Sequence, residues 1–157
     1  MLCDMSGANG HSVLPAKHLH VEIPSAVELL SLVDQVSDGF ARLAGFDEDS
    51  SHWLAVSVRE AVINGIKHGN RNDPLKRVRL DYRVETGDGA GRVVVCIQDE
   101  GEGFDPRHIA NPLAPENMTM SCGRGIFMMR SFMDDVQVRH VPGSGTEVTL
   151  TKGVGRA

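Results

Sequence analysis

Cysteine is scarce in this sequence, basic residues are fewer than acidic ones, and long apolar runs are absent. The three cysteines, Cys3, Cys96 and Cys122, are odd in number, far apart and without C-x-x-C spacing, which favours reduced thiols over disulfides or a metal site. The 16 Lys and Arg against 21 Asp and Glu give a net charge of -5, which argues against sequence-independent binding to nucleic acid or to an anionic membrane. No apolar stretch approaches the length that spans a bilayer, and the N-terminus lacks the pattern of a secretory signal. We therefore expect a cytoplasmic protein with no nucleic-acid or membrane partner.

The rest of the composition is that of one folded domain. The chain has 157 residues, of which 41% are hydrophobic and 24% charged, and this length is enough for a single core. Residues 1–17 are rich in Gly, Ser, Asn and His without periodicity, which is typical of a flexible tail. We expect a domain over residues 18–152 and a short C-terminal tail over residues 153–157.

Hydrophobic spacing predicts a strand and then a helix at the start of the domain. Alternation over residues 18–23 favours a short strand. Ser25 and Glu28 stand at capping-box spacing, which predicts a helix start. Apolar residues then recur in steps of four and three up to Leu43, and Gly45 follows. This pattern indicates an amphipathic helix.

The remaining pattern predicts the fold class. A second helix is expected over residues 53–68, with Gly69 as its stop. The later elements are strands at 78–85 and 92–98, a long loop at 105–122, a helix at 123–133 and strands at 135–140 and 146–152. Strands that come in adjacent pairs, rather than alternating with helices, favour an α/β two-layer sandwich. We expect a mainly antiparallel mixed sheet with helices on one face.

The second helix carries polar residues at regular spacing. Glu60, Asn64 and His68 are four residues apart, which places them in one column with Lys67 beside it. One interpretation is a solvated stripe, since most helical glutamates are exposed. The other is a site in which Glu60 accepts a proton and Asn64 offers a neutral oxygen to Mg²⁺.

A D-x-G-x-G element follows the strand at residues 92–98. Asp99 comes directly after this strand, and Gly101 and Gly103 complete the element. An aspartate there can accept a hydrogen bond from the exocyclic amine of adenine, while glycines let a flat ring approach the backbone. A glycine turn with a capping aspartate gives the same pattern, so this motif alone is weak evidence.

Glycines also open the predicted third helix. Gly123 and Gly125 flank Arg124, and a helix N-terminus offers free N–H groups and a positive dipole end to phosphate oxygens. Arg124 adds a charge, although a plain surface arginine has the same appearance. No G-x-x-x-x-G-K-[ST] occurs, so any phosphate site is of another type.

Together, in this order, these motifs resemble a known family. Glu60-x-x-x-Asn64, Asp99-x-Gly-x-Gly, the glycines near Arg124 and a Gly-Thr pair ending in Thr146 resemble the N, G1 and G2 boxes of the Bergerat-fold (GHKL) ATPase superfamily. That superfamily includes gyrase B, the heat-shock chaperone of ninety kilodaltons, histidine kinases and MutL. Segments 64–70 and 123–130 look like the stand-alone anti-sigma-factor serine kinases of the RsbW type. The resemblance covers about residues 21–152.

The resemblance implies an ATP site with Mg²⁺. Glu60 would act as general base and Asn64 would hold Mg²⁺. Asp99 would bind the adenine amine, with Thr146 assisting, and residues 105–122 would form the ATP lid. The other residues that the resemblance assigns to this site are Lys67, His68, Gly101, Gly103, Gly123, Arg124 and Gly125.

The function that the resemblance implies is protein phosphorylation. We expect an ATP-dependent serine/threonine kinase that binds a sigma factor and phosphorylates an anti-sigma-factor antagonist, and that forms a homodimer. Two alternatives stay open: a nucleotide-gated binding module without phosphotransfer, and a detached histidine-kinase catalytic domain. The chain shows no helical pair bearing a phosphoacceptor histidine, which counts against the latter.

Overall fold

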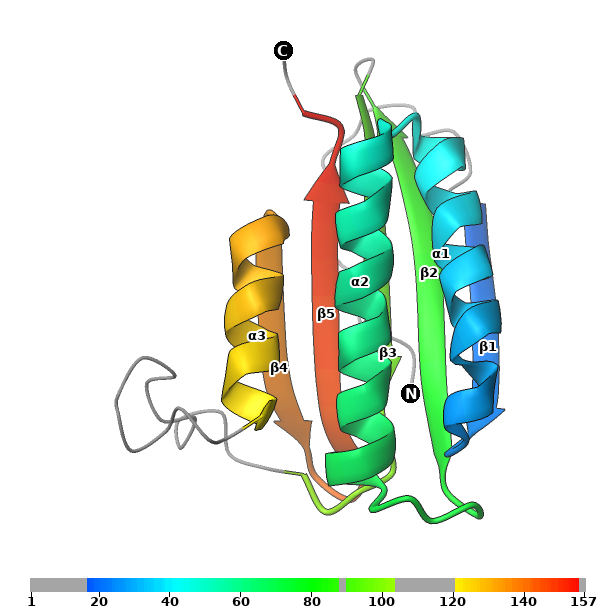
Figure 1. Ribbon diagram of the computed structural model, residues 1–157, viewed down its shortest axis with the longest axis vertical. Coiled ribbons are helices and arrows are strands. Elements are labelled where there is room, and N and C mark those ends of the chain that lie inside the picture. Colours follow the sequence, from blue (N-terminus) through cyan, green and yellow to red (C-terminus); the bar gives the residue numbers. More distant parts are fainter. Residues whose placement is uncertain (1–16, 88–89, 104–120, 156–157) are drawn as a thin grey trace.

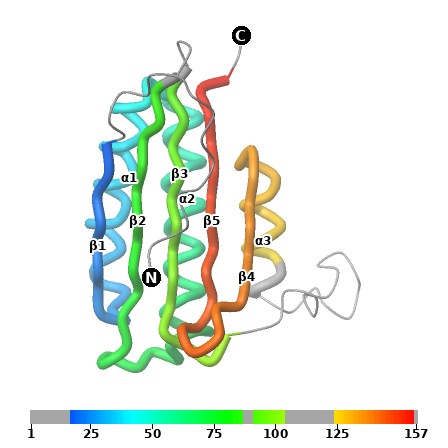
Figure 2. The backbone as a smooth tube through the Cα atoms, turned by 180° about the vertical axis from the view of Figure 1, so that it is seen from behind, coloured from blue at the N-terminus to red at the C-terminus, as the bar shows by residue number. Residues whose placement is uncertain are grey.

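The computed structural model describes residues 17–87, 90–103 and 121–155, and it confirms the predicted two-layer sandwich. The helices all lie against one face of the sheet (Figure 1), and the other face of the described sheet is free of helices (Figure 2). The elements are β1 (Lys17–Pro24), η1 (Val27–Leu29), α1 (Leu30–Ala44), α2 (Glu48–Asn64), η2 (Gly65–Gly69), β2 (Arg77–Gly87), β3 (Ala90–Gln98), α3 (Ser121–Phe132), β4 (Asp135–Val141) and β5 (Gly145–Gly153).

The five strands form one sheet in the order β1-β2-β3-β5-β4. Every pairing between the described strands is antiparallel, so the prediction of a mainly antiparallel sheet is confirmed. β3 lies at the centre, which explains why Val93 and Val95 are fully buried. Their alternation with partly exposed residues keeps one face of the strand towards the helices.

The start of the first helix differs from the prediction. Ser25 and Glu28 do not form a capping box: the hydroxyl of Ser25 donates to the carbonyl of Lys76 at 2.9 Å, and α1 begins at Leu30 after a 3₁₀ turn, without a side-chain cap. Ser25 is therefore used to tie the end of β1 to the segment before β2. The helix ends as predicted at Gly45, which has a φ of 80°, a left-handed conformation that glycine adopts without strain.

The second helix begins and ends earlier than predicted, at Glu48 and Asn64 instead of residues 53 and 68. Asp47 caps it, accepting a hydrogen bond from the Ser50 N–H at 2.7 Å, and the α-helix ends at Asn64. Residues Gly65–Gly69 then form a π turn. Because a π turn is wider than an α turn, the four-residue column does not continue regularly beyond Asn64.

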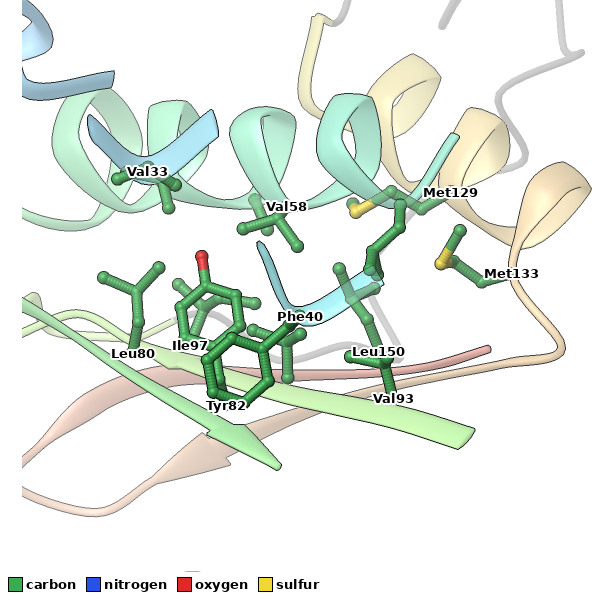
Figure 3. Close-up of a cluster of buried hydrophobic side chains, with 14 of the residues drawn as sticks. Val33, Phe40, Val58, Leu80, Tyr82, Val93, Ile97, Met129, Met133 and Leu150 are labelled. Carbon is green, nitrogen blue, oxygen red and sulfur yellow. The ribbon is translucent and has the colours of Figure 1, made fainter. Parts of the chain in front are cut away.

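The core lies between the helices and the sheet, as Figure 3 shows. Tyr82 is fully buried, and its hydroxyl lies 3.0 Å from that of Ser37, so the phenol keeps a hydrogen bond. Burial raises the pKa of Tyr82 to about 12. The predicted apolar stripe of α1 is wrong at its end, because Leu43 is 48% exposed while Ser37 is buried.

The last helix begins two residues earlier than predicted, at Ser121. Its glycines therefore lie inside the first turn and a half, not before the helix. Most of the predicted loop at 105–122, and the tail predicted over 1–17 except Lys17, lie outside the described residues. Among the helices that are described, none is long and apolar enough to cross a membrane.

Candidate nucleotide site

Asp99 occupies a buried position directly after β3. Its side chain is 6% exposed, and its Oδ1 accepts hydrogen bonds from the N–H groups of Gly101 at 2.9 Å and Thr146 at 3.1 Å. The Asp99 N–H in turn donates to the Thr146 carbonyl at 3.1 Å. Burial raises the pKa of Asp99, and the two backbone N–H donors act in the opposite direction. With Oδ1 occupied, Oδ2 is the oxygen that remains for a ligand.

Three glycines surround this carboxylate. A Cβ on Gly69 would lie 2.3 Å from Cγ and Oδ2 of Asp99, and a Cβ on Gly145 would lie 2.3 Å from its Oδ1. A Cβ on Gly101 would lie 2.2 Å from the carbonyl oxygen of Gly69. No side chain fits at these positions, so the backbone of π turn η2 approaches the D-x-G-x-G segment as closely as backbone can.

Thr146, whose backbone is hydrogen-bonded to Asp99, has a buried hydroxyl with no hydrogen-bond partner among the described residues. Such an orphan group costs free energy unless a ligand or water satisfies it. Asp99 and Thr146 thus supply an acceptor and a further polar atom at one place. This combination fits the edge of a nucleobase.

Glu60 of α2 and Gly125 of α3 are in contact. A Cβ on Gly125 would lie 2.3 Å from Oε1 of Glu60, so the carboxylate rests against the first turns of α3. Asn64 lies one turn further along α2, is half-buried, and has no hydrogen-bond partner in the described part of the chain. Arg124 is exposed on α3. The structure therefore brings the first and third motifs into contact.

Other predicted residues are placed less tightly. Lys67 and His68 are exposed on the π turn. Gly123 lies in α3. Gly103, with a φ of 78°, lies against the imidazole of His140. Asp99, Gly101, Gly103 and Thr146 are thus grouped.

Asn70 is a residue of the site's framework that sequence reasoning did not identify. It is fully buried; its Nδ2 donates to Ser25 Oγ and to the Arg77 carbonyl, each at 2.9 Å. Its Oδ1 accepts from the N–H of Glu100 at 2.8 Å. Asn70 thereby fixes the D-x-G-x-G segment to the π turn. The sequence feature that could have identified Asn70 is its position at the end of the N-box motif.

A comparison with protein families assigns this chain to a class. The model of the histidine kinase-like ATPase domain matches residues 23–152, and the chain belongs to this family. Membership implies ATP binding. The matched region contains every residue that the sequence assigned to the site.

Curated relatives include proteins named serine-protein kinase RsbW. The one from Bacillus subtilis is 26% identical over 143 residues, covering 87% of this chain and 86% of the relative. The one from Staphylococcus epidermidis is 27% identical over 142 residues, with 86% of each chain covered. A crystal structure of the RsbU and RsbW domains of a Mycobacterium tuberculosis protein has a TM-score of 0.56 at 19% identity. The match covers 87% of this chain and 31% of that longer one, and it supports the fold.

The residues present fit a magnesium nucleotide. The buried Thr146 hydroxyl without a partner and the glycine-lined Asp99 carboxylate suit a base. Asn64 offers an amide oxygen without a competing partner among the described residues. Mg²⁺ keeps several waters and takes much of its coordination from substrate phosphates, so it needs few protein ligands, and Asn64 would supply one of them.

Proposed function

We propose that this protein is an ATP-dependent serine/threonine kinase of a partner-switching pathway. Support comes chiefly from one observation: the Glu60 carboxylate lies against Gly125 at the start of α3. A carboxylate is thus held beside the helix end proposed to face the phosphates. The similarity to serine-protein kinases named RsbW supports the same function.

Each residue of the proposed mechanism has a distinct task. Asp99 and Thr146 bind the base, and Gly123, Arg124 and Gly125 face the phosphates with Lys67 and His68 nearby. Asn64 would hold Mg²⁺, which when bound would screen the phosphate charge. The oxygen of the acceptor hydroxyl attacks the γ-phosphorus while Glu60 takes the proton of that hydroxyl. ADP is the leaving group.

The proposed acceptor is a serine or threonine of an anti-sigma-factor antagonist. Phosphorylation adds negative charge to that protein, which would release it from the kinase and free the kinase to bind its sigma factor. We place this exchange in the cytoplasm. The proposed homodimer is tested directly by light scattering, which would return twice the monomer mass of 17.0 kDa.

The test of kinase function measures phosphate transfer to antagonist proteins encoded in the same genome. Glu60→Gln is expected to lower kcat by about 10²- to 10⁴-fold, because it removes the general base, while the Kd for Mg-ATP stays within about twofold. Glu48→Gln, an exposed change on the first turn of the same helix, is the matched control. Normal ATP binding with no transfer to any acceptor would instead support a nucleotide-gated binding module.

A further inference from the structure

His140, near the end of β4, lies beside the proposed base site. In the sheet it is directly opposite Thr146 of β5. Val136 and Val138 precede it at two-residue spacing and pack against the core. Because side chains two apart point to the same face of a strand, His140 is on the face that the helices cover. Asp99 just after β3, Thr146 of β5 and His140 of β4 therefore form a row at one end of the sheet.

The imidazole of His140 is held against the D-x-G-x-G segment. A Cβ on Gly103 would lie 1.8 Å from its Nδ1 and 2.3 Å from its Cε1, so the ring packs directly on the Gly103 backbone. Gly103 has a positive φ of 78°, which fixes the direction of the chain under the ring. Strand pairing on one side and this backbone on the other position the imidazole.

The ring nevertheless keeps free surface, because His140 is exposed. Its neighbour in the row is Thr146, whose buried hydroxyl has no partner among the described residues, and Asp99 lies on the far side of Thr146. Asp99 and Thr146 are the two residues proposed to bind the base. The groups proposed to face phosphates, Glu60 and Gly125, belong instead to α2 and α3. An aromatic ring at the edge of a base site offers a face or an edge to the nucleoside.

We propose that the His140 imidazole contacts the nucleoside of bound ATP and positions it against Asp99 and Thr146. This inference rests on the proposed nucleotide site. It adds a residue outside the three motifs to the recognition of the base and ribose. The contact is the same for ATP and ADP, because both carry the same nucleoside.

The affinity test compares His140→Ala, His140→Phe and the wild-type protein by calorimetric titration with Mg-ATP and Mg-ADP. His140→Ala is expected to weaken both ligands about tenfold, and His140→Phe, which keeps a ring, is expected to retain most of the affinity. Gln137→Ala is the matched control: it lies on the same strand, is exposed, and stands on the opposite face at odd spacing from His140.

A spectroscopic measurement detects the contact itself. The NMR signal of the His140 Hε1 proton, assigned by its loss in His140→Ala, is expected to shift when ADP is added to the wild-type protein, and to stay in place with inorganic tripolyphosphate. A ring that only supports Gly103 would not distinguish these ligands in this way.

The outcomes separate this inference from the proposed function. Wild-type affinity in His140→Ala would overturn the contact while leaving the nucleotide site intact. Equal losses in the Ala and Phe variants, together with an unshifted Hε1 signal, would assign His140 to packing and also overturn it. Failure of the wild-type protein to bind Mg-ATP or Mg-ADP would overturn the proposed function itself.

Discussion

Gly69 and Asp99 are in direct contact across two segments that are thirty residues apart: a Cβ on Gly69 would lie 2.3 Å from both Cγ and Oδ2 of the aspartate. The π turn of residues Gly65–Gly69 brings the glycine to this place. If residues 65–69 continued α2 as an α-helix, the last turn would point in a different direction. The contact therefore couples the end of the N-box motif to the carboxylate proposed to bind adenine.

Gly69→Ala is expected to abolish measurable nucleotide binding, a loss of at least about 100-fold, and to lower the free energy of unfolding by about 2 kcal/mol, because the new methyl overlaps a buried carboxylate. Calorimetry and urea unfolding measure the two effects. Gly39→Ala is the control: a Cβ there meets nothing within 4 Å, so this change inside α1 should stabilise the protein by about 0.5–1 kcal/mol. Unimpaired ADP binding by Gly69→Ala would refute the assigned contact.

Asp99→Asn is expected to weaken ATP and ADP alike and yet to raise the Tm at pH 7. Burial raises the pKa of Asp99, so its charged form is disfavoured in the folded state. A raised carboxyl pKa gives stability that is present below the unfolded value and is lost as pH rises through the folded value. The gain in Tm over wild type should therefore shrink as the pH falls towards 3.8, the ordinary value.

Thermal unfolding from pH 4 to pH 8, with and without ADP, tests this prediction. Without ADP the variant should be the more stable protein near neutrality, and with saturating ADP the wild type should gain more, because a ligand stabilises only the state that binds it. A variant that is less stable at pH 7 and equally stabilised by ADP would contradict both the electrostatic argument and the binding role.

Asn70→Ala is expected to destabilise the protein by about 3 kcal/mol, because it removes a fully buried side chain and leaves the part-buried Arg77 carbonyl and Glu100 N–H without their partner. The free energy of unfolding in urea measures this loss. Gln137→Ala, at an exposed position, should change it by less than about 0.5 kcal/mol. ADP affinity should fall as well, since Asn70 holds the segment that begins at Asp99. A loss below about 1 kcal/mol would show that water replaces the amide.

Phe132→Ala is expected to cost about 2 kcal/mol and to change the intrinsic fluorescence, because Phe132 stacks on Trp53. The ring centroids are 3.4 Å apart and the planes differ by 3°, and Trp53 is the sole tryptophan in the sequence. Fluorescence-detected unfolding reports both quantities. Phe127→Ala is the control on the same helix, since Phe127 is 47% exposed. Indistinguishable emission spectra for wild type and Phe132→Ala would argue against the stack.

Local pattern was sufficient to predict most elements, because each depends on neighbours in the chain. The strand pairs and the end of α1 at Gly45 follow from alternation and capping chemistry. The predicted capping box at Ser25 was wrong because the Ser25 hydroxyl donates instead to the carbonyl of Lys76, a residue distant in the chain. The prediction that Leu43 belongs to the buried stripe was wrong, because helical spacing does not say which side of a helix the sheet covers.

The sequence by itself determined which chemical groups this protein carries and in what order: a carboxylate and an amide on α2, an aspartate after β3, and glycines at the start of α3. Residue identity and spacing along one element are enough for that. Only the tertiary structure decided that Gly69 and Gly145 enclose Asp99, that Glu60 rests on Gly125, and that His140 lies on Gly103. These contacts join segments distant in the chain, and their geometry comes from strand order and helix packing rather than from any local preference.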